Sequence, residues 1–392
     1  MPFRRPRPLP VLRLLPATCL AALVVFAGCE QFDTGYRILA GGKSGEIVVV
    51  ADSATWAGPI GEALRSEIGP YQTTLSPIDE ERLFDLRRMD LTEQFYNVVQ
   101  RQHAVVFAAP LSDQTDEAQY LRDRLGPDAL AAVEGGAPGV FSKHDLWAEG
   151  QLIVYGTGAD EQAAAEAIRQ RGPVLRRQLA ELVRGRTEED MFKKARQVEL
   201  EDTLMLHHGF AVNVQHDYFI AKDTTYGPDA GYVRLRRLLD GTGRDLFVAY
   251  EPGRAPLAPD ALADELDRLA EAHLPGSRDG SFVQIERRKP FRADTVEIEG
   301  LQATELRGLW RMTEDFMGGP FVAYRFYEPA QDRTYSYYGM VFAPNFRKRE
   351  FLRQMEVIAH TFRSDAAGSA DVVMAANFGF DGTAVAEHHH TE

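Results

Sequence analysis

The fold of the first half of the chain is decided by the stretch EIVVVADSATWAGPIGEALR at residues 46–65. Residues 47–50 are all β-branched, which is typical of a strand buried on both faces. Apolar residues at helical spacing follow Pro59, and proline suits the first turn of a helix. We therefore predict a buried strand and then a helix, with Ser53 or Thr55 as the N-cap.

The alternation of strand and helix continues to about residue 190. Further strands are predicted at residues 104–109 and 151–156, and helices at residues 91–101, 116–125 and 160–184, the last disturbed at Gly172-Pro173. Strands that alternate with helices indicate an α/β domain, which we place at residues 45–190. A charged, mostly helical connector is predicted at residues 187–206.

The second half of the chain has a different pattern. Apolar and polar residues alternate at residues 210–215, as in a strand with one buried face. Further strands are predicted at residues 232–238, 246–250, 282–287, 295–301, 321–327 and 334–342, and helices at residues 259–273 and 347–362. The last two strands flank a polar turn and form a long hairpin. We predict an α+β domain at residues 205–365, with an antiparallel sheet packed by helices.

The first 29 residues have the features of a lipoprotein leader. A basic start precedes an apolar run at residues 14–28, which is shorter than the roughly 20 residues of a spanning helix. The run ends in Phe26-Ala27-Gly28-Cys29, which resembles a lipobox, although Leu is usual where Phe26 stands. We expect a signal peptide at residues 1–28, cleavage before Cys29, and acyl groups such as palmitate on that cysteine. An ordinary signal peptide or an uncleaved anchor is the alternative.

The anchor predicts where the protein resides. Residues 29–44 would form a flexible tether, and the membrane, through lipid on Cys29, is the first expected partner. By analogy with known lipoproteins, Glu30 after the cysteine favours the outer membrane of the bacterial cell envelope. Residues 366–392 are expected to be a disordered tail. We expect no metal on the His388-His389-His390 run of this tail, because a flexible segment holds tetrahedral geometry poorly.

The charge of the chain excludes one class of partner. The chain has 44 basic and 58 acidic residues, a formal net charge of −14. Such an acidic surface repels phosphate backbones, so we expect no nucleic-acid partner. Local basic runs, such as residues 234–237, are interpreted as solvated strand and helix faces.

Two segments of the first half resemble a known family. They are residues 45–65 and the segment His144-Asp-Leu-Trp-Ala-Glu-Gly-Gln-Leu-Ile-Val-Tyr155. Downstream of a lipobox cysteine, they are similar to the lipoprotein family labelled domain of unknown function 4837. The likeness is carried by the order of Trp56, Gly58, Gly61, Trp147 and Gln151. It implies an envelope lipoprotein, covers most of the mature chain, and brings no activity, cofactor or catalytic residue.

A second likeness concerns residues 207–363. The order of strands, a central helix, an aromatic hairpin and a closing helix that ends in Thr361-Phe362 is similar to the PsbP-like fold. That fold is an α/β/α sandwich used mostly for binding other proteins. The likeness implies an architecture and leaves the function open.

One position suits a small-molecule site. Asp52 follows the buried strand of residues 46–50, and α/β folds often bind ligands where a strand ends. Asp52 could be a polar group of such a site and Trp56 an apolar wall. The alternative is a helix start, in which Ser53 is the cap, Asp52 favours the helix dipole and Trp56 packs in the core.

No metal site or catalytic site is predicted. His207, His208 and His216 lie close together in the sequence, and Asp217 could be a further ligand. No HExxH pattern or cysteine pair accompanies them, so we interpret them as structural or surface residues. The sequence has no recognisable nucleophile motif, and we expect no cofactor.

The hairpin predicted at residues 321–342 is rich in aromatic residues. If one face of the sheet is open, its outward tyrosines, including Tyr335 and Tyr337, would contact a partner, because exposed Tyr is common at interfaces. If the closing helix at residues 347–362 covers that face, the same tyrosines belong to the core.

Taken together, these features predict a membrane-tethered, non-enzymatic protein that functions in binding or assembly. Another envelope protein would be its second partner. The alternative is an envelope hydrolase or a small-molecule-binding protein with its site near Asp52.

Overall fold

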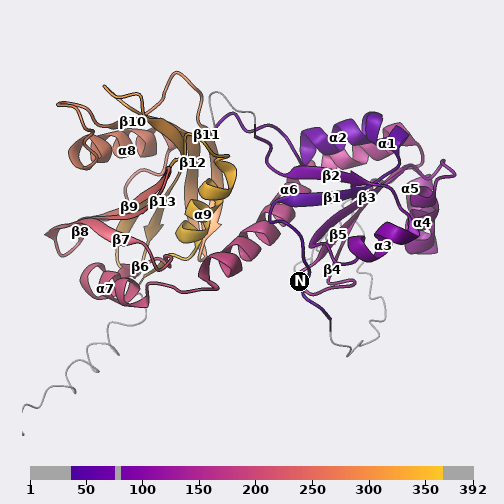
Figure 1. Ribbon diagram of the computed structural model, residues 1–392, viewed down its shortest axis with the longest axis horizontal. Coiled ribbons are helices and arrows are strands. Elements are labelled where there is room, and N and C mark those ends of the chain that lie inside the picture. The colour runs from indigo at the N-terminus through magenta and orange to yellow at the C-terminus, as the bar shows by residue number, and fades with distance from the viewer. Residues whose placement is uncertain (1–36, 76–80, 365–392) are drawn as a thin grey trace, which may run out of the picture. The chain divides into compact units, whose positions relative to one another are not determined.

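The computed structural model describes residues 37–75 and 81–364 (Figure 1). β1 (Glu46–Val50) lies in a five-stranded sheet with the order β2-β1-β3-β5-β4. The other strands are β2 (Asp85–Met89), β3 (Ala104–Ala108), β4 (Gly139–His144) and β5 (Leu152–Thr157). Neighbouring strands are parallel, except that β4 runs antiparallel to β5 at the edge. The three predicted strands are confirmed, and β2 and β4 are additions.

Helices cover both faces of this sheet. They are α1 (Ser53–Ala57), α2 (Pro59–Glu67), α3 (Glu93–Val99), α4 (Asp116–Arg124), α5 (Pro127–Glu134) and α6 (Glu161–Phe192). α2 and α6 bury Leu64 and Leu179 in the cluster on one face, and α4 and α5 bury Leu121 and Val133 on the other. The α/β class predicted for the first half is confirmed, with a mixed sheet.

α6 is longer than the sequence predicted. It continues through Pro173 and reaches Phe192. Leu175 and Leu179, after the proline, stay buried in the same cluster, so apolar packing offsets the backbone donor that Pro173 lacks. α7 (Val198–His208) follows, and the predicted connector is therefore mostly helix. The division into two domains stays a prediction.

The second half forms an eight-stranded antiparallel sheet. The strands follow the order β10-β12-β13-β14-β9-β8-β7, and β11 pairs with β12. They are β7 (Phe219–Gly227), β8 (Ala230–Leu239), β9 (Thr242–Pro252), β10 (Val283–Ile285), β11 (Arg292–Ile298), β12 (Leu301–Met312), β13 (Gly318–Glu328) and β14 (Arg333–Phe342). β13 and β14 are the predicted hairpin.

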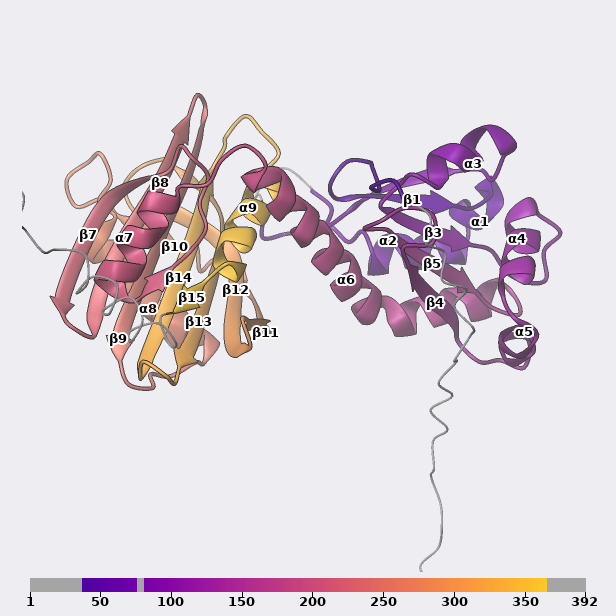
Figure 2. The same cartoon turned by 90° about the horizontal axis from the view of Figure 1, so that it is seen from below.

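Helices lie on opposite faces of this second sheet (Figure 1 and Figure 2). α8 (Pro259–His273) packs on the face that contains Phe247, whereas α7 and α9 (Arg349–His360) pack on the face that contains Val248. Adjacent strand residues point to opposite faces, so Phe247 and Val248 belong to different clusters. The predicted α+β class is confirmed.

The prediction of a strand at residues 210–215 is largely wrong. Only β6 (Phe210–Ala211) forms, and it pairs with β15 (Arg363–Ser364). Val212 and Val214 are nonetheless fully buried. The alternation of the sequence therefore reflects burial here, and not pairing in a sheet.

Several sequence predictions lie outside the described residues. They concern the signal peptide, Cys29, the first part of the tether, and the tail with its His388-His389-His390 run. Within residues 37–75 and 81–364, no helix combines the length and the apolar character that crossing a membrane requires.

Candidate functional site

An apolar pocket opens on the α8 side of the second sheet. Its volume is about 430 Å³, within the range of roughly 300–1,000 Å³ that is usual for small-molecule sites. Its apolar walls are Leu274, Val283, Trp310, Met312, Met340 and Phe342. These residues belong to the cluster beneath α8 or pack against it. The pocket is thus a cavity at the edge of this apolar cluster, and it opens to solvent.

The pocket forms because α8 ends before the sheet does. The helix stops at His273, and residues 274–277 form one wall. At the opposite wall Gly243 of β9 pairs with Leu238 of β8 and with Phe342 of β14. A Cβ atom at Gly243 would stand 3.6 Å from Leu238 Cδ2, which is ordinary contact. The glycine therefore leaves open a space that a side chain could fill.

Large apolar side chains surround the mouth of the pocket. Leu238 and Leu239 at the end of β8 are 53% and 45% exposed, and Met317 before β13 is 42% exposed. An apolar patch beside a cavity is typical of a binding surface, because water solvates it poorly. The rim extends the apolar surface of the pocket toward solvent.

Two arginines of β8 share one carboxylate at the pocket wall. Arg234 donates from Nε to Asp245 Oδ1 at 2.7 Å and from Nη2 to Oδ2 at 2.5 Å. The Nε of Arg236 lies 2.9 Å from the same Oδ2. All three side chains point to the α8 face because they occupy alternate positions of paired strands. Burial lowers the pKa of Arg234, but the bonds to Asp245 outweigh it and raise the pKa.

The sequence analysis missed this site. It interpreted residues 234–237 as a solvated face, whereas Arg234 and Arg236 line the pocket and Arg237 points to the other face, where it pairs with Asp217 at 2.6 Å. One signal was present: Leu238-Leu239 stands directly before the turn at Asp240-Gly241, where polar residues are usual.

Asp52 lies where it was expected, at the end of β1, but its carboxylate accepts hydrogen bonds from the first turn of α1. Oδ1 accepts bonds from the backbone N–H of Ala54 at 2.8 Å and of Thr55 at 3.1 Å, and Oδ2 accepts one from Thr55 Oγ1. Burial raises the pKa of Asp52, and the bonds from Thr55 and Ala54 lower it below the ordinary value. Asp52 is thus the N-cap of α1, and the prediction of Ser53 or Thr55 is wrong.

Trp56 packs against the core of the first sheet. It is half-buried beside the cluster under α2. The guanidinium of Arg65 lies 4.8 Å from its ring centroid, and Arg65 Nη1 donates to the Trp56 carbonyl at 2.8 Å. These contacts agree with the packing alternative for Trp56 and leave the proposed ligand contact without support.

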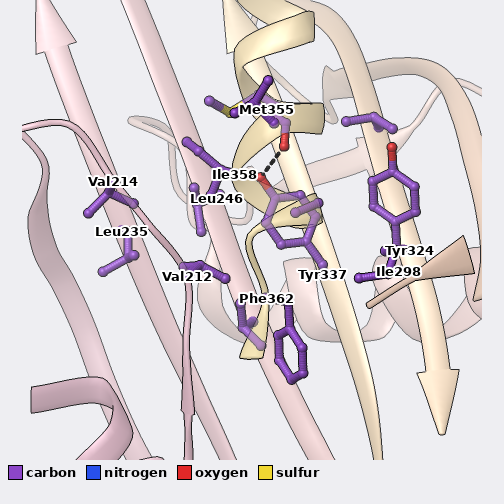
Figure 3. Packing of buried hydrophobic residues seen from close by; sticks show 14 of the residues in the cluster. Val212, Val214, Leu235, Leu246, Ile298, Tyr324, Tyr337, Met355, Ile358 and Phe362 are labelled. Carbon is purple, nitrogen blue, oxygen red and sulfur yellow. Dashed lines mark hydrogen bonds between the residues drawn. The ribbon is translucent and has the colours of Figure 1, made fainter. Parts of the chain in front are cut away.

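The expectation that Tyr335 and Tyr337 face a partner is wrong. Tyr335 is fully buried and Tyr337 is 2% exposed. The Tyr337 hydroxyl donates to the backbone carbonyl of Met355 in α9 at 2.8 Å (Figure 3). The closing helix therefore covers this face of the sheet, as the alternative prediction had it, and both tyrosines belong to the core.

The histidines near residue 210 are not brought together with Asp217. His208 is the last residue of α7 and is buried, with Nδ1 3.0 Å from the Tyr250 hydroxyl and Nε2 3.2 Å from Asp223 Oδ1. His207 and His216 are exposed. In the part of the chain that the structure describes, no three His, Cys, Asp or Glu side chains are grouped so that they could hold a metal ion.

Two family models divide the described chain near the end of α6. Residues 197–361 match the family described as Domain of unknown function (DUF4837). We call this matched segment, residues 197–361, the DUF4837 domain. Residues 40–192 match a different family, described as Domain of unknown function (DUF8532). No curated protein matches the chain.

The family predicted from the sequence is confirmed, but for a different part of the chain. The residues that carried the resemblance lie within 40–192, the segment that matches DUF8532, and not within the DUF4837 domain. The apolar pocket, with Arg234, Arg236 and Asp245, lies entirely inside the DUF4837 domain.

The residues that carried the resemblance have structural roles. A Cβ atom at Gly61 would lie 1.9 Å from the Trp56 carbonyl oxygen, so only glycine lets α1 and α2 approach this closely. Gln151 is buried; its Nε2 donates to the carbonyls of Gln100 at 3.0 Å and Gln102 at 2.7 Å, and its Oε1 accepts from Trp147 N–H at 3.1 Å. Gly61 thus permits close packing of two helices, and Gln151 connects the segment before β3 to the segment between β4 and β5.

Proposed function

We propose that this protein is a lipid-anchored binding protein of the bacterial outer membrane, and that its DUF4837 domain holds an apolar ligand in the pocket beside α8. The pocket carries the proposal: it has an apolar wall, an open mouth and an exposed apolar rim. The ionisable groups at its wall are arginines and aspartates, with Asp245 held by Arg234 and Arg236. Such groups suit recognition by charge better than proton transfer near neutral pH.

The anchor rests on Cys29 and the residues before it. We expect the Cys29→Ser chain to lose all incorporation of labelled palmitate, because the acyl groups attach to the cysteine sulfur. Metabolic labelling and immunoprecipitation measure this. The matched control is Cys19→Ser, which should be labelled and processed normally, since Cys19 belongs to the predicted signal peptide. Normal labelling of the Cys29→Ser chain would contradict the anchor.

Filling the pocket is expected to weaken ligand binding. The probe is octanol, titrated by calorimetry into the mature chain with Cys29→Ser, which lacks acyl groups that would compete. Gly243→Leu should weaken binding at least about tenfold, because the new side chain extends into the cavity, and tenfold corresponds to about 1.4 kcal/mol.

Gly185→Leu is the matched control for this experiment. Gly185 is exposed on α6, and a Cβ atom there would meet nothing within 4 Å. We expect it to bind octanol as the parent chain does. If the parent chain does not bind octanol, or if both variants bind it equally, the pocket is not a ligand site and the proposal is wrong.

A further inference from the structure

The charges at the pocket wall do not balance. Arg234 engages both oxygens of Asp245 through a two-pronged hydrogen bond, and Arg236 approaches the same carboxylate from a second direction. Two guanidinium groups therefore share one carboxylate. Asp315, the other acidic residue at the pocket, is held by Arg278 Nε at 3.2 Å and by Ser281 Oγ at 3.0 Å. The wall formed by β8 and β9 thus keeps one positive charge.

Two nitrogen atoms of the Arg236 guanidinium are available to bind a ligand. Its side chain is 34% exposed, and among the described residues none accepts a hydrogen bond from its Nη1 or Nη2. A guanidinium presents its donors in a planar fork that matches the two oxygens of a carboxylate. The Nη edge of Arg236 can therefore receive a carboxylate while Nε stays beside Asp245.

A further cation stands next to this wall. Arg244 precedes Asp245 on β9 and is 4% exposed, and its Nε and Nη1 are buried without a hydrogen-bond partner among the described residues. Its guanidinium lies 4.5 Å from the ring centroid of Phe351, on the face opposite the pocket. A buried cation with unsatisfied donors makes the surrounding potential more positive, and a low dielectric strengthens its effect. Arg244 therefore adds to the attraction for an anion at the β8–β9 wall.

We infer that the pocket binds a single-chain amphiphile with a carboxylate head, such as a fatty acid, a proposal that rests on the proposed function of the pocket. The apolar tail lies against Trp310, Met312 and Met340, and the carboxylate pairs with Arg236. The side of the wall that faces the pocket carries one excess positive charge, from Arg234, Arg236 and Asp245, and this charge matches a monoanion. A cavity of about 430 Å³ with an apolar wall suits a short chain. The apolar wall thus recognises the tail of the ligand, and Arg236 recognises its carboxylate head.

The test compares octanoate with octanol, which share a tail and differ in the charge of the head. Both are titrated by calorimetry into the mature chain with Cys29→Ser at neutral pH. We expect octanoate to bind about tenfold more tightly, because a hydrogen bond to a charged group contributes about that factor. Arg236→Met keeps an apolar stem against the wall and removes the charge. It should lower the ratio of octanoate affinity to octanol affinity to about one, because it weakens octanoate binding more than octanol binding.

Arg268→Gln is the control for a general loss of positive charge. Arg268 lies on α8, its side chain is 66% exposed, and it pairs with Glu265. This variant should keep the preference for octanoate. Equal binding of octanoate and octanol by the parent chain would overturn the inference and leave the proposed function standing. Failure of both ligands to bind would instead refute the proposed function. A variant at Arg236 that weakens both ligands equally would also overturn the inference.

Discussion

Tyr337→Ser is expected to lower the free energy of unfolding by about 3–5 kcal/mol, by analogy with large-to-small changes in protein cores. Tyr337 is 2% exposed and packs between β14 and α9. Serine removes the ring, leaves a cavity beneath α9 and loses the bond to the Met355 carbonyl. Urea unfolding of the mature chain, followed by circular dichroism, measures the change.

Tyr337→Phe is the matched control for the hydroxyl group. It keeps the ring and removes one hydrogen bond, so we expect a loss of about 1 kcal/mol. If Tyr337→Ser left the unfolding midpoint unchanged, the burial of this residue would be contradicted. Tyr337 would then be a surface residue.

Arg307→Met is expected to destabilise the DUF4837 domain by about 3–5 kcal/mol at neutral pH, because it leaves a buried carboxylate without its cation. Arg307 on β12 donates to Glu305 from Nε at 2.6 Å and from Nη2 at 2.7 Å. Its Nη1 also donates to Glu356 of α9. Glu305 is 6% exposed, so in the parent chain its charge is compensated mainly by Arg307 and little by water.

The loss caused by Arg307→Met should depend on pH. Burial by itself raises the pKa of Glu305, but the charge and the hydrogen bonds of Arg307 lower it by a larger amount. The pKa of Glu305 in the folded chain is therefore below its ordinary value. The carboxylate therefore stabilises the parent fold above the ordinary pKa of a glutamate, about 4.5, and that contribution is lost as the pH falls below it. Without Arg307, burial dominates and the pKa rises. The difference between the two chains should be largest at neutral pH and shrink toward acid pH.

A double variant separates the lost ion pair from lost packing. Glu305→Gln combined with Arg307→Met removes both charges, and we expect it to be more stable at neutral pH than Arg307→Met alone. Chemical denaturation of both variants at several pH values provides the comparison. Equal stability of the single and the double variant, with no dependence on pH, would show that the charge of Glu305 does not matter.

The helices and strands with strong local patterns could be predicted, because hydrophobic periodicity and residue type along one segment are enough to identify them. The β-branched run of β1 and the bounds of α8 agree with the prediction. β2 was missed because Asp85-Leu-Arg-Arg-Met89 has low strand propensity and is held by its pairing with β1. The end of α6 was misplaced because the helix continues where Thr187 and Met191 are buried.

Little of the candidate site could be predicted, because its residues come from separate elements. Gly243 leaves a space that is defined by Leu238 and Phe342 on the neighbouring strands. Phe342 lies far from Gly243 in the chain, so the local pattern around Gly243 does not show that the two residues are neighbours. The prediction at Asp52 placed the residue correctly at a strand end, but the competition between a ligand and a cap was decided by Thr55, three residues on.

The sequence by itself determined the order of architectures, an α/β part followed by an antiparallel α+β part, and the acidic character of the chain. Local periodicity and composition are sufficient for those properties. Only the tertiary structure decided that α9 buries Tyr337, and that Arg234 and Arg236 meet Asp245 beside an apolar pocket. Alternation in a strand shows that neighbouring side chains point to opposite faces, but it does not show what covers each face. That depends on contacts between residues far apart in the chain.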